Sequence, residues 1–241
     1  MTLLVQDVRY ALRTLRKSPG FTAVVVLTLA FGIGLNTTVF TLANAVLFRG
    51  LPFESADRIL YLRNGDPKQP RQSEGVSFAE LHDLRAQARS FAGIAGYGVF
   101  TANVADSSRL PERLVGTRIS ANGFRLIGQR PVVGRDFTSA DERADAAPVA
   151  ILSHSAWVGR YGGEASILGR VVRINEVATV VVGVMAEDMK FPAGGDLWIP
   201  LKPRKSEEKR SERPLEAFAR LRDDTTPGQA GAELAMLSEA Y

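Results

Sequence analysis

The side chains best suited to chemistry are two histidines, His82 and His154, in a chain without cysteine. Two histidines so far apart in the sequence, with no thiolate, make a transition-metal site improbable. Ser153 and Ser155 flank His154, but adjacent residues of a helix point apart, and no Gly-x-Ser-x-Gly turn surrounds either serine. We therefore expect no catalytic residue, no metal site and no enzyme activity, and we expect capping or surface roles for these side chains.

Two glycine-rich stretches could suggest phosphate or nucleotide binding. Gly32-Ile33-Gly34 begins a Gly-x-Gly motif, but it lies inside a long apolar run and follows no strand, so its context excludes a dinucleotide site. "YGGEASILG", residues 161–169, has the glycine spacing of a phosphate loop without its terminal Gly-Lys-Ser/Thr. We expect this chain to hold no cofactor.

Composition is that of an ordinary globular protein, with 45% hydrophobic and 23% charged residues among 241. The net charge of +4 is spread along the chain, and no segment interleaves basic with aromatic residues, so we expect no nucleic-acid partner. The average conceals one asymmetry. Residues 21–48 carry no ionisable side chain at all.

This apolar run predicts a transmembrane helix over residues 20–48. A helix rises 1.5 Å per residue, so residues 21–40 alone cover about 30 Å, the thickness of a bilayer core. The strongly apolar residues of that window favour insertion by about 5 kcal/mol in sum. The whole run is longer than the bilayer core, so the helix must tilt or extend above the membrane.

A cleaved signal peptide is the main alternative, because "LANA", residues 42–45, contains an Ala-x-Ala pattern. The apolar run is nearly twice the usual length of a signal core, and an element of its own precedes it, so we favour a retained anchor. A buried core helix is the third alternative.

Residues 1–19 predict an amphipathic helix that lies in the membrane interface on the cytoplasmic side. Its apolar face would carry Leu4, Val8, Leu12 and Leu15. The excess of cations before the apolar run orients the chain, with the N-terminus in the cytoplasm and all residues after Arg49 outside the cytoplasmic (inner) membrane. These anchoring cations are Arg9, Arg13, Arg16 and Lys17.

Small residues within the apolar run could form a seam for helix packing in the bilayer. Glycine, alanine and threonine allow close approach of membrane helices, and asparagine can donate hydrogen bonds across such a contact. Alternatively, these residues are merely tolerated in a membrane helix. The candidate packing residues are Ala30, Gly32, Gly34, Asn36, Thr38, Thr41 and Asn44.

Residues 51–241 predict an extracytoplasmic α+β domain with two lobes. A strand at 58–62 and a helix capped by Ser77, with Glu80 completing a capping box, form the first strand–helix unit. "LEAFARLRD" and a helix capped by Thr226, with Pro227 at its first position, form the last. We expect these two units to pair as one split lobe.

A β-rich lobe, at about 109–201, would be inserted between these units. It contains a buried strand at 148–153 that leads into a helix capped by Ser153 and ended by Gly162-Gly163. A hairpin follows at 170–185. The charged stretch 202–214 would connect the lobes, and we expect a solvated loop without a partner there.

Several segments of the sequence resemble a known family. "GIGLNTTVFTLANAVLFRGLPFESADRIL", residues 32–60, resembles the first membrane helix of MacB-type ABC transporter permeases, especially the duplicated permeases common in acidobacteria. Later segments resemble successive motifs of the MacB-like periplasmic core domain, in order and over nearly the whole chain. They are 114–137, 149–163, 167–185 and 196–201.

The resemblance implies a membrane permease component of an ABC-type exporter, active in transport and efflux. It would couple the motion of a cytoplasmic ABC ATPase, which binds the ATP as a separate subunit or domain, to an extracytoplasmic domain. Implied partners are that ATPase, further permease helices or a second permease copy in a dimer, a periplasmic adaptor and the lipid bilayer. The alternative function is a single-span anchored binding or docking module without transport, and a secreted enzyme is disfavoured.

Two features depart from the family pattern. Its hairpin usually carries Asn-Gly, whereas this chain has Asn175-Glu176. Glutamate is costly where a tight turn needs positive φ, so we expect a longer or different turn. The family also has further membrane helices and a closing strand after this domain, so we expect the chain ending at Tyr241 to be an N-terminal fragment or a truncated product.

Overall fold

The computed structural model describes residues 19–43, 55–63, 65, 74–106, 109–207 and 209–238. The chain divides into two compact units, Met1–Gly50 and Leu51–Tyr241, and each is described by itself. The predicted interfacial helix at 1–19 therefore lies almost wholly outside the described residues, as do its anchoring cations and Asn44.

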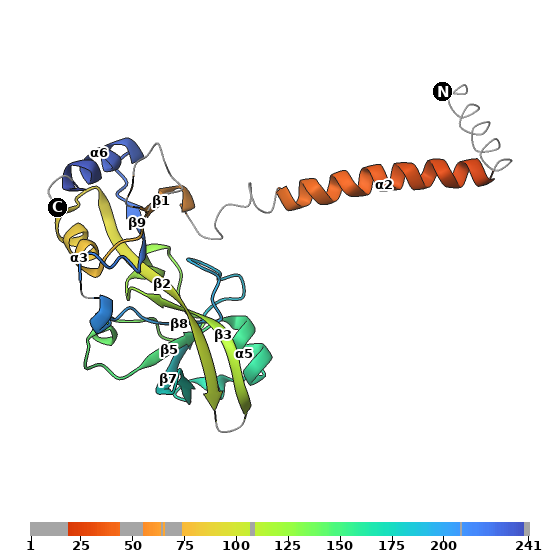
Figure 1. Ribbon diagram of the computed structural model, residues 1–241. Helices are drawn as coiled ribbons and strands as arrows, with labels where there is room; N and C mark the ends of the chain where they lie inside the picture. The colour runs from red at the N-terminus through yellow and green to blue at the C-terminus, as the bar shows by residue number, and fades with distance from the viewer. Residues whose placement is uncertain are drawn as a thin grey trace. The chain divides into compact units, whose positions relative to one another are not determined.

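The described part of the first unit is a single helix, α2, Pro19–Ala43, drawn in Figure 1. Large apolar side chains stand exposed along it, among them Val24, Leu27, Phe31 and Ile33. Among the residues with a described placement, no helix was found to combine the length and apolarity needed to cross a membrane. The membrane span stays a prediction.

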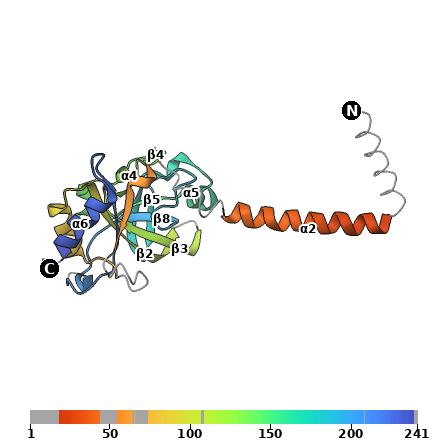
Figure 2. The ribbon, with the colours of Figure 1, turned by 90° about the horizontal axis from the view of Figure 1, so that it is seen from above.

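The second unit is built on one mixed sheet, which counts nine strands over the described residues (Figure 1 and Figure 2). The spatial order is β1-β9-β2-β3-β8-β5-β7-β4, and β6 pairs with both β2 and β7. The strands are β1 Ile59–Leu62, β2 Phe91–Asp106, β3 Arg109–Ile119, β4 Val133–Gly134, β5 Val149–Leu152, β6 Val171–Ile174, β7 Val177–Val184, β8 Leu197–Pro200 and β9 Glu216–Leu221.

Short helices complete this unit, and the predicted α+β class is confirmed for it. The α-helices are α3 Phe78–Gln87, α4 Gly123–Leu126, α5 His154–Tyr161 and α6 Pro227–Ser238. Four 3-10 turns are described as well, at Ala56–Arg58, Ser139–Glu142, Ala165–Ile167 and Lys205–Glu207.

The first and last strand–helix units lie together, as the sequence predicted. Strand β1 pairs antiparallel with β9, which pairs antiparallel with β2. Helices α3 and α6 contribute to the same buried cluster, where Leu81 and Ala230 are almost inaccessible to solvent. The predicted capping box of α3 is present, with Ser77 Oγ accepting from the N–H of Glu80 and the Glu80 carboxylate accepting from the N–H of Ser77. Local capping thus places α3 over this end of the sheet.

Strand β2 connects this half of the sheet to the β-rich half. Its first residues pair with β9, whereas Val104 and Ala105 pair with Ile174 and Arg173 of β6. Strand β3 pairs with β2 along almost its whole length and then, in parallel, with β8. The two halves therefore share one continuous sheet rather than meeting only through loops.

The hairpin between β6 and β7 corrects the expectation of a longer or different turn. The turn is two residues long, with φ of 47° at Asn175 and 69° at Glu176. Asn175 is fixed by β2: its N–H donates to the Asn103 carbonyl at 3.0 Å, its Oδ1 accepts from the Asn103 N–H at 2.9 Å, and its Nδ2 donates to the Thr101 carbonyl at 3.0 Å. These three bonds offset the strain at Glu176.

The charged connection 202–214 corrects a second expectation, because it is not a solvated loop without partners. Glu207 is buried and accepts two hydrogen bonds from Arg118 of β3, at 2.7 and 2.9 Å. Arg213 pairs with Glu80 of α3 at 2.8 Å and with Glu74. Ion pairs therefore hold this connection against both halves of the sheet.

The strain at Glu176 makes Glu176→Gly a stabilising substitution. Positive φ costs a residue with a Cβ about 1–2 kcal/mol, and the extra freedom of glycine in the unfolded chain returns about 0.5–1 kcal/mol. We expect the free energy of unfolding to rise by about 0.5–1 kcal/mol. Urea denaturation of the chain in detergent micelles, followed by tryptophan fluorescence, measures it.

Asn175→Gly is the matched control, because it relieves the same kind of strain but removes two side-chain hydrogen bonds to β2. It should lower the free energy of unfolding. A gain from both substitutions would contradict the role assigned to Asn175.

The Arg118–Glu207 pair predicts a defined pH dependence. The hydrogen bonds from Arg118 hold the pKa of Glu207 below its ordinary value. A lowered folded pKa adds stability that is fully present above the unfolded pKa of about 4.3 and is lost as the pH falls through the folded value. At neutral pH, the free energy of unfolding of the wild type should therefore exceed that of Glu207→Gln by about 1.5–3 kcal/mol. This difference should shrink below about pH 4.

Glu212→Gln is the control, since Glu212 is an exposed carboxylate of the same connection. It should change the free energy of unfolding by less than about 0.5 kcal/mol at any pH. A Glu207 difference that is constant with pH would refute the ion-pair account.

Candidate functional site

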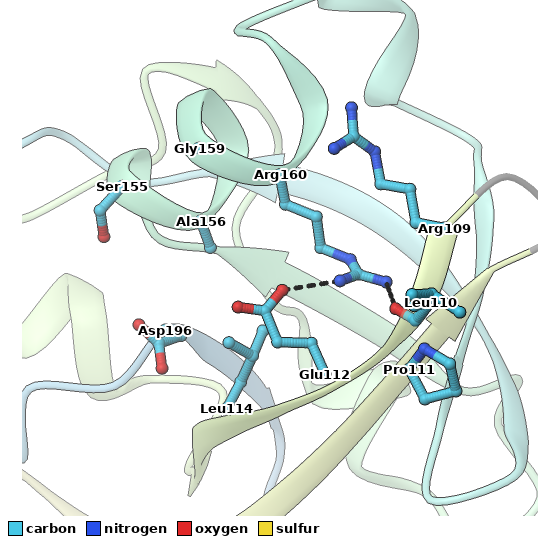
Figure 3. Close-up of a pocket in the computed structure, with 10 residues that line it drawn as sticks. All are labelled: Arg109, Leu110, Pro111, Glu112, Leu114, Ser155, Ala156, Gly159, Arg160 and Asp196. Atoms are coloured by element: carbon cyan, nitrogen blue, oxygen red, sulfur yellow. Dashed lines mark hydrogen bonds and ion pairs between the residues drawn. The ribbon is translucent and has the colours of Figure 1, made fainter.

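In the described part of the second unit, a groove of about 660 Å³ lies between strand β3 and helix α5, as Figure 3 shows. We call it the β3–α5 groove. Strand β3 contributes Arg109, Leu110, Pro111, Glu112 and Leu114; helix α5 contributes Ser155, Ala156, Gly159 and Arg160; and Asp196 lies just before β8.

Arg160 is the buried charge of the groove, with only 7% of its surface exposed. Its Nη1 donates to Glu112 Oε2 at 2.7 Å, and its Nη2 donates to the Leu110 carbonyl at 3.1 Å. The buried Asp106 carboxylate lies 3.7 Å away. Burial alone would lower the pKa of Arg160, but its hydrogen bonds to Tyr161 and Glu112 outweigh burial and raise that pKa. The guanidinium therefore stays charged and ties α5 to the β2–β3 hairpin.

Helix α5 is positioned as the sequence predicted. Ser153 caps it, with its Oγ accepting from the Ala156 N–H at 3.1 Å, and Gly162 ends it at φ 68°. Apart from Arg160, the residues of α5 that line the groove are small: Ser155, Ala156 and Gly159. A Cβ added at Gly159 would meet no atom within 4 Å. This wall leaves the groove open.

Asp196 marks the end of the groove nearest β8. Its main-chain N–H donates to the Val115 carbonyl at 2.7 Å, and its Oδ2 accepts from the Val115 N–H at 2.9 Å. Arg109 stands at the other end in Figure 3, and the Glu112–Arg160 pair lies between them. The groove thus carries a cation at one end and a carboxylate at the other.

The Ser153-His154-Ser155 stretch does not form a nucleophile–base pair. Ser153 acts as the helix cap, and its Oγ lies 3.0 Å from Ser155 Oγ. The His154 ring packs edge-on against Trp157, with centroids 5.6 Å apart. His82 is exposed on α3, 3.8 Å from the Asp83 carboxylate. Capping and surface roles account for these side chains.

Within the described ranges, no cluster of three or more histidine or acidic side chains could hold a metal ion. The expected absence of catalysis, metal and cofactor stays a prediction. The groove offers hydrogen-bonding groups and charges of both signs.

The predicted membrane-packing residues are described only in part. Ala30 and Gly34 are exposed on α2, and a Cβ added at Gly34 would meet no atom within 4 Å. The side chains of Asn36, Thr38 and Thr41, and the surroundings of Gly32, lie outside the described residues. The packing seam stays a prediction.

Sequence reasoning named none of the groove residues as a site. One signal could have indicated it: Pro111 within a predicted strand is typical of a strand edge, because proline cannot donate to a neighbouring strand. The ion pair between Glu112 and Arg160, 48 residues apart, has no comparable signal in the sequence.

Comparisons with known proteins indicate the family. A family model described as the MacB-like periplasmic core domain matches residues 22–237. No curated protein was found to be significantly similar to the chain. Among solved structures, the periplasmic region of MacB from Actinobacillus actinomycetemcomitans has a TM-score of 0.60 at 18% identity, over 81% of this chain and 87% of that one.

Two further structures share the fold. A domain of a protein described as a permease from Porphyromonas gingivalis has a TM-score of 0.60 at 16% identity, over 78% of this chain and 86% of that one. The extracellular domain of the noncanonical ABC-type transporter YknZ from Gram-positive bacteria has a TM-score of 0.51 at 12% identity, over 73% of this chain and 86% of that one. At these identities the likeness supports the fold alone.

Arg160 should be the most sensitive residue of the groove. Arg160→Met removes the buried cation that pairs with Asp106 and Glu112. Breaking a buried ion pair in this way should lower the free energy of unfolding by about 3–5 kcal/mol. Urea denaturation of the chain in detergent micelles measures the loss.

Arg109→Met is the matched control, because Arg109 is an exposed cation of the same groove. Its effect on the free energy of unfolding should stay within about 0.5 kcal/mol. Equal losses from both substitutions would show that Arg160 stabilises the fold no more than a surface arginine does.

Proposed function

Because the chain belongs to the MacB-like periplasmic core domain family, we propose that it is the membrane-anchored extracytoplasmic part of an ABC-type export permease. The observation that carries this proposal is the extent of the family match, which begins at residue 22 inside α2 and continues to residue 237 in α6. The family therefore includes the apolar helix as well as the folded domain.

The anchor is supported by the properties of α2. Its 25 residues would be about 38 Å long, enough for the hydrocarbon core of a bilayer. Apolar side chains such as Leu29, Phe31 and Ile33 are more than half exposed, which is unfavourable in water and favourable in lipid. With cations preceding the helix, the N-terminus lies in the cytoplasm and residues 51–241 lie outside.

The working role of the domain is to move as one body. The 16-residue strand β2 runs through both halves of the sheet. The Arg118–Glu207 and Arg213–Glu80 pairs also hold the connection 202–214 against both halves. A displacement applied at one end is thereby passed to the other rather than absorbed between lobes.

In this role the chain itself needs neither a nucleotide nor a catalytic side chain. A separate ABC ATPase binds the ATP, and further permease helices or a second permease copy pack against α2. A periplasmic adaptor contacts the outer domain. A docking module without transport is the second candidate, and the β3–α5 groove is the observation that favours it.

Cysteine labelling tests the orientation cleanly, because the chain has no native cysteine. Ser139 is exposed in the second unit, and Ser18 precedes α2. Ser139→Cys should react with a membrane-impermeant maleimide in cells whose outer membrane is permeabilised, and Ser18→Cys should react only after lysis. The reverse pattern would overturn the proposed orientation.

The same variants test the coupling to an ATPase. The tagged chain, purified in mild detergent from membranes of its host, should bring down an ABC ATPase. In that complex, ATP with vanadate should change the labelling rate of Ser139→Cys at least twofold. Correct orientation with no associated ATPase and an unchanged rate would reject transport and support the docking module.

A further inference from the structure

An open strand edge lies beside the β3–α5 groove, at Arg113, between the lining residues Glu112 and Leu114. Asn103 of β2 lies opposite Arg113 of β3, and its main-chain N–H and C=O are both bonded to Asn175 on the other side. When two antiparallel strands pair, directly opposite residues behave alike. If one directs its N–H and C=O away from the partner strand, the residue opposite it does the same. The N–H and C=O of Arg113 therefore point away from β2.

The neighbouring pair confirms this alternation. Thr101 also bonds to Asn175, and its partner Val115 directs both main-chain groups to Asp196. The edge of β3 is thus covered at Val115 and, from Gly116 onward, by β8. Within the described residues, nothing pairs with the main chain of Arg113 on that side. The main chain of Arg113 thus leaves one donor and one acceptor side by side, and its neighbours Glu112 and Leu114 line the groove.

The groove beside this edge has room for a second main chain. Its other wall is the part of α5 that carries Ser155, Ala156 and Gly159, where a Cβ at position 159 would meet nothing within 4 Å. Leu110, which is 86% exposed, adds apolar surface beside this wall. The space is extended, apolar in part and lined by hydrogen-bonding groups.

The charges along the groove have an order. Asp196 lies at the β8 end and Arg109 at the opposite end, and the Glu112–Arg160 ion pair lies between them (Figure 3). The carboxylate of Glu112 is half exposed although it also binds Arg160. An occupant with a cation at its Asp196 end and an anion at its Arg109 end would match this order.

From these observations we infer that the β3–α5 groove binds an extended peptide segment of a partner protein, which adds as a short antiparallel strand to the edge of β3. A residue that offers both N–H and C=O on one side can pair with a parallel or an antiparallel strand, and the antiparallel direction is favoured because parallel pairing is slightly less stable per residue. The segment then carries a basic residue near its amino end and an acidic residue near its carboxyl end.

A second copy of this chain is a poorer occupant. Two-fold antiparallel pairing of identical edges centred on Arg113 would place this residue opposite Arg113 of the second copy, and like charges directly opposed are destabilising. Pro111 also limits the ladder, because it has no N–H to donate. These features discourage self-association and leave an edge that selects a short foreign segment.

Residues 109–114 would face about six residues of the partner at 3.4 Å each. The probe is therefore a fluorescent six-residue peptide with Lys first, Glu last and alternating Thr and Val between them. Fluorescence anisotropy with the 241-residue chain in detergent micelles should show saturable binding. The peptide with Glu first and Lys last should bind at least about tenfold more weakly, because antiparallel pairing would oppose like charges.

Main-chain pairing is tested by N-methylation of the peptide. Only alternate residues of a bound strand direct their N–H groups to β3. A peptide methylated at its odd positions and one methylated at its even positions should therefore differ in affinity, and only one of the two should lose binding. If both versions bind as well as the parent peptide, the peptide is not held as an added strand and the inference fails.

Two substitutions locate the binding. Gly159→Leu fills the groove without a clash of its Cβ, and it should abolish binding while the free energy of unfolding stays equal or rises, since leucine favours a helix. Gly231→Leu on α6 is the matched control, because a Cβ there also meets nothing within 4 Å, and it should leave binding unchanged. If both variants bind the peptide as well as the wild type does, the peptide binds elsewhere and the inference is wrong.

A charge exchange tests the direction. Arg109→Glu should weaken binding of the Lys-first, Glu-last peptide about tenfold and restore binding to a peptide with Lys at both ends. Failure of the second peptide to bind would show that Arg109 does not face the peptide's carboxyl end. None of these measurements depends on transport or on an ATPase, so their outcome is independent of the proposed function.

Discussion

The hydrogen bonds of Asn175 to strand β2 decide how the rest of the β-rich half is arranged. They engage Thr101 and Asn103 on the edge of β2 that faces away from β3. As a result, β2 pairs with β9 and then β6 on one side and with β3 on the other, and it becomes the shared strand of both halves. The same alternation fixes which main-chain groups of β3 face Asp196 and the groove. One asparagine in a strained turn is thereby bonded to the strand that both halves share.

Buried charges then hold the elements that this register brings together. Burying an ion pair contributes little net stability, since desolvation offsets the attraction, but losing one partner is costly. The main effect of Arg160 and of the Arg118–Glu207 pair is therefore to fix the positions of the elements that they join. Arg160 fixes α5 against the hairpin, and Glu207 fixes the connection between β8 and β9 against β3. Any other placement of these elements would leave a charge buried without a partner.

What could be predicted from the sequence was mostly local. The capping box at Ser77 and Glu80, the Ser153 cap and Gly162 end of α5, and the start of α6 at Pro227 follow from short motifs, and the structure has them all. The pairing of the first and last units followed from their similar layout. The turn at Glu176 and the role of Glu207 were wrong in the sequence prediction for one reason: their stabilising partners lie 72 or more positions away in the chain. A local cost was visible, but the distant hydrogen bonds that offset it were not.

The groove escaped prediction for a different physical reason. Motif searches detect side chains whose chemistry needs a particular residue type, whereas the unpaired groups beside the groove belong to the main chain of Arg113, and any residue but proline would supply them. Two features leave room beside this edge. The facing helix has glycine at position 159, and β8 pairs with β3 only from Gly116 onward. The groove is accordingly encoded in where strands end and which positions stay small, and such information becomes apparent only once the sheet is assembled.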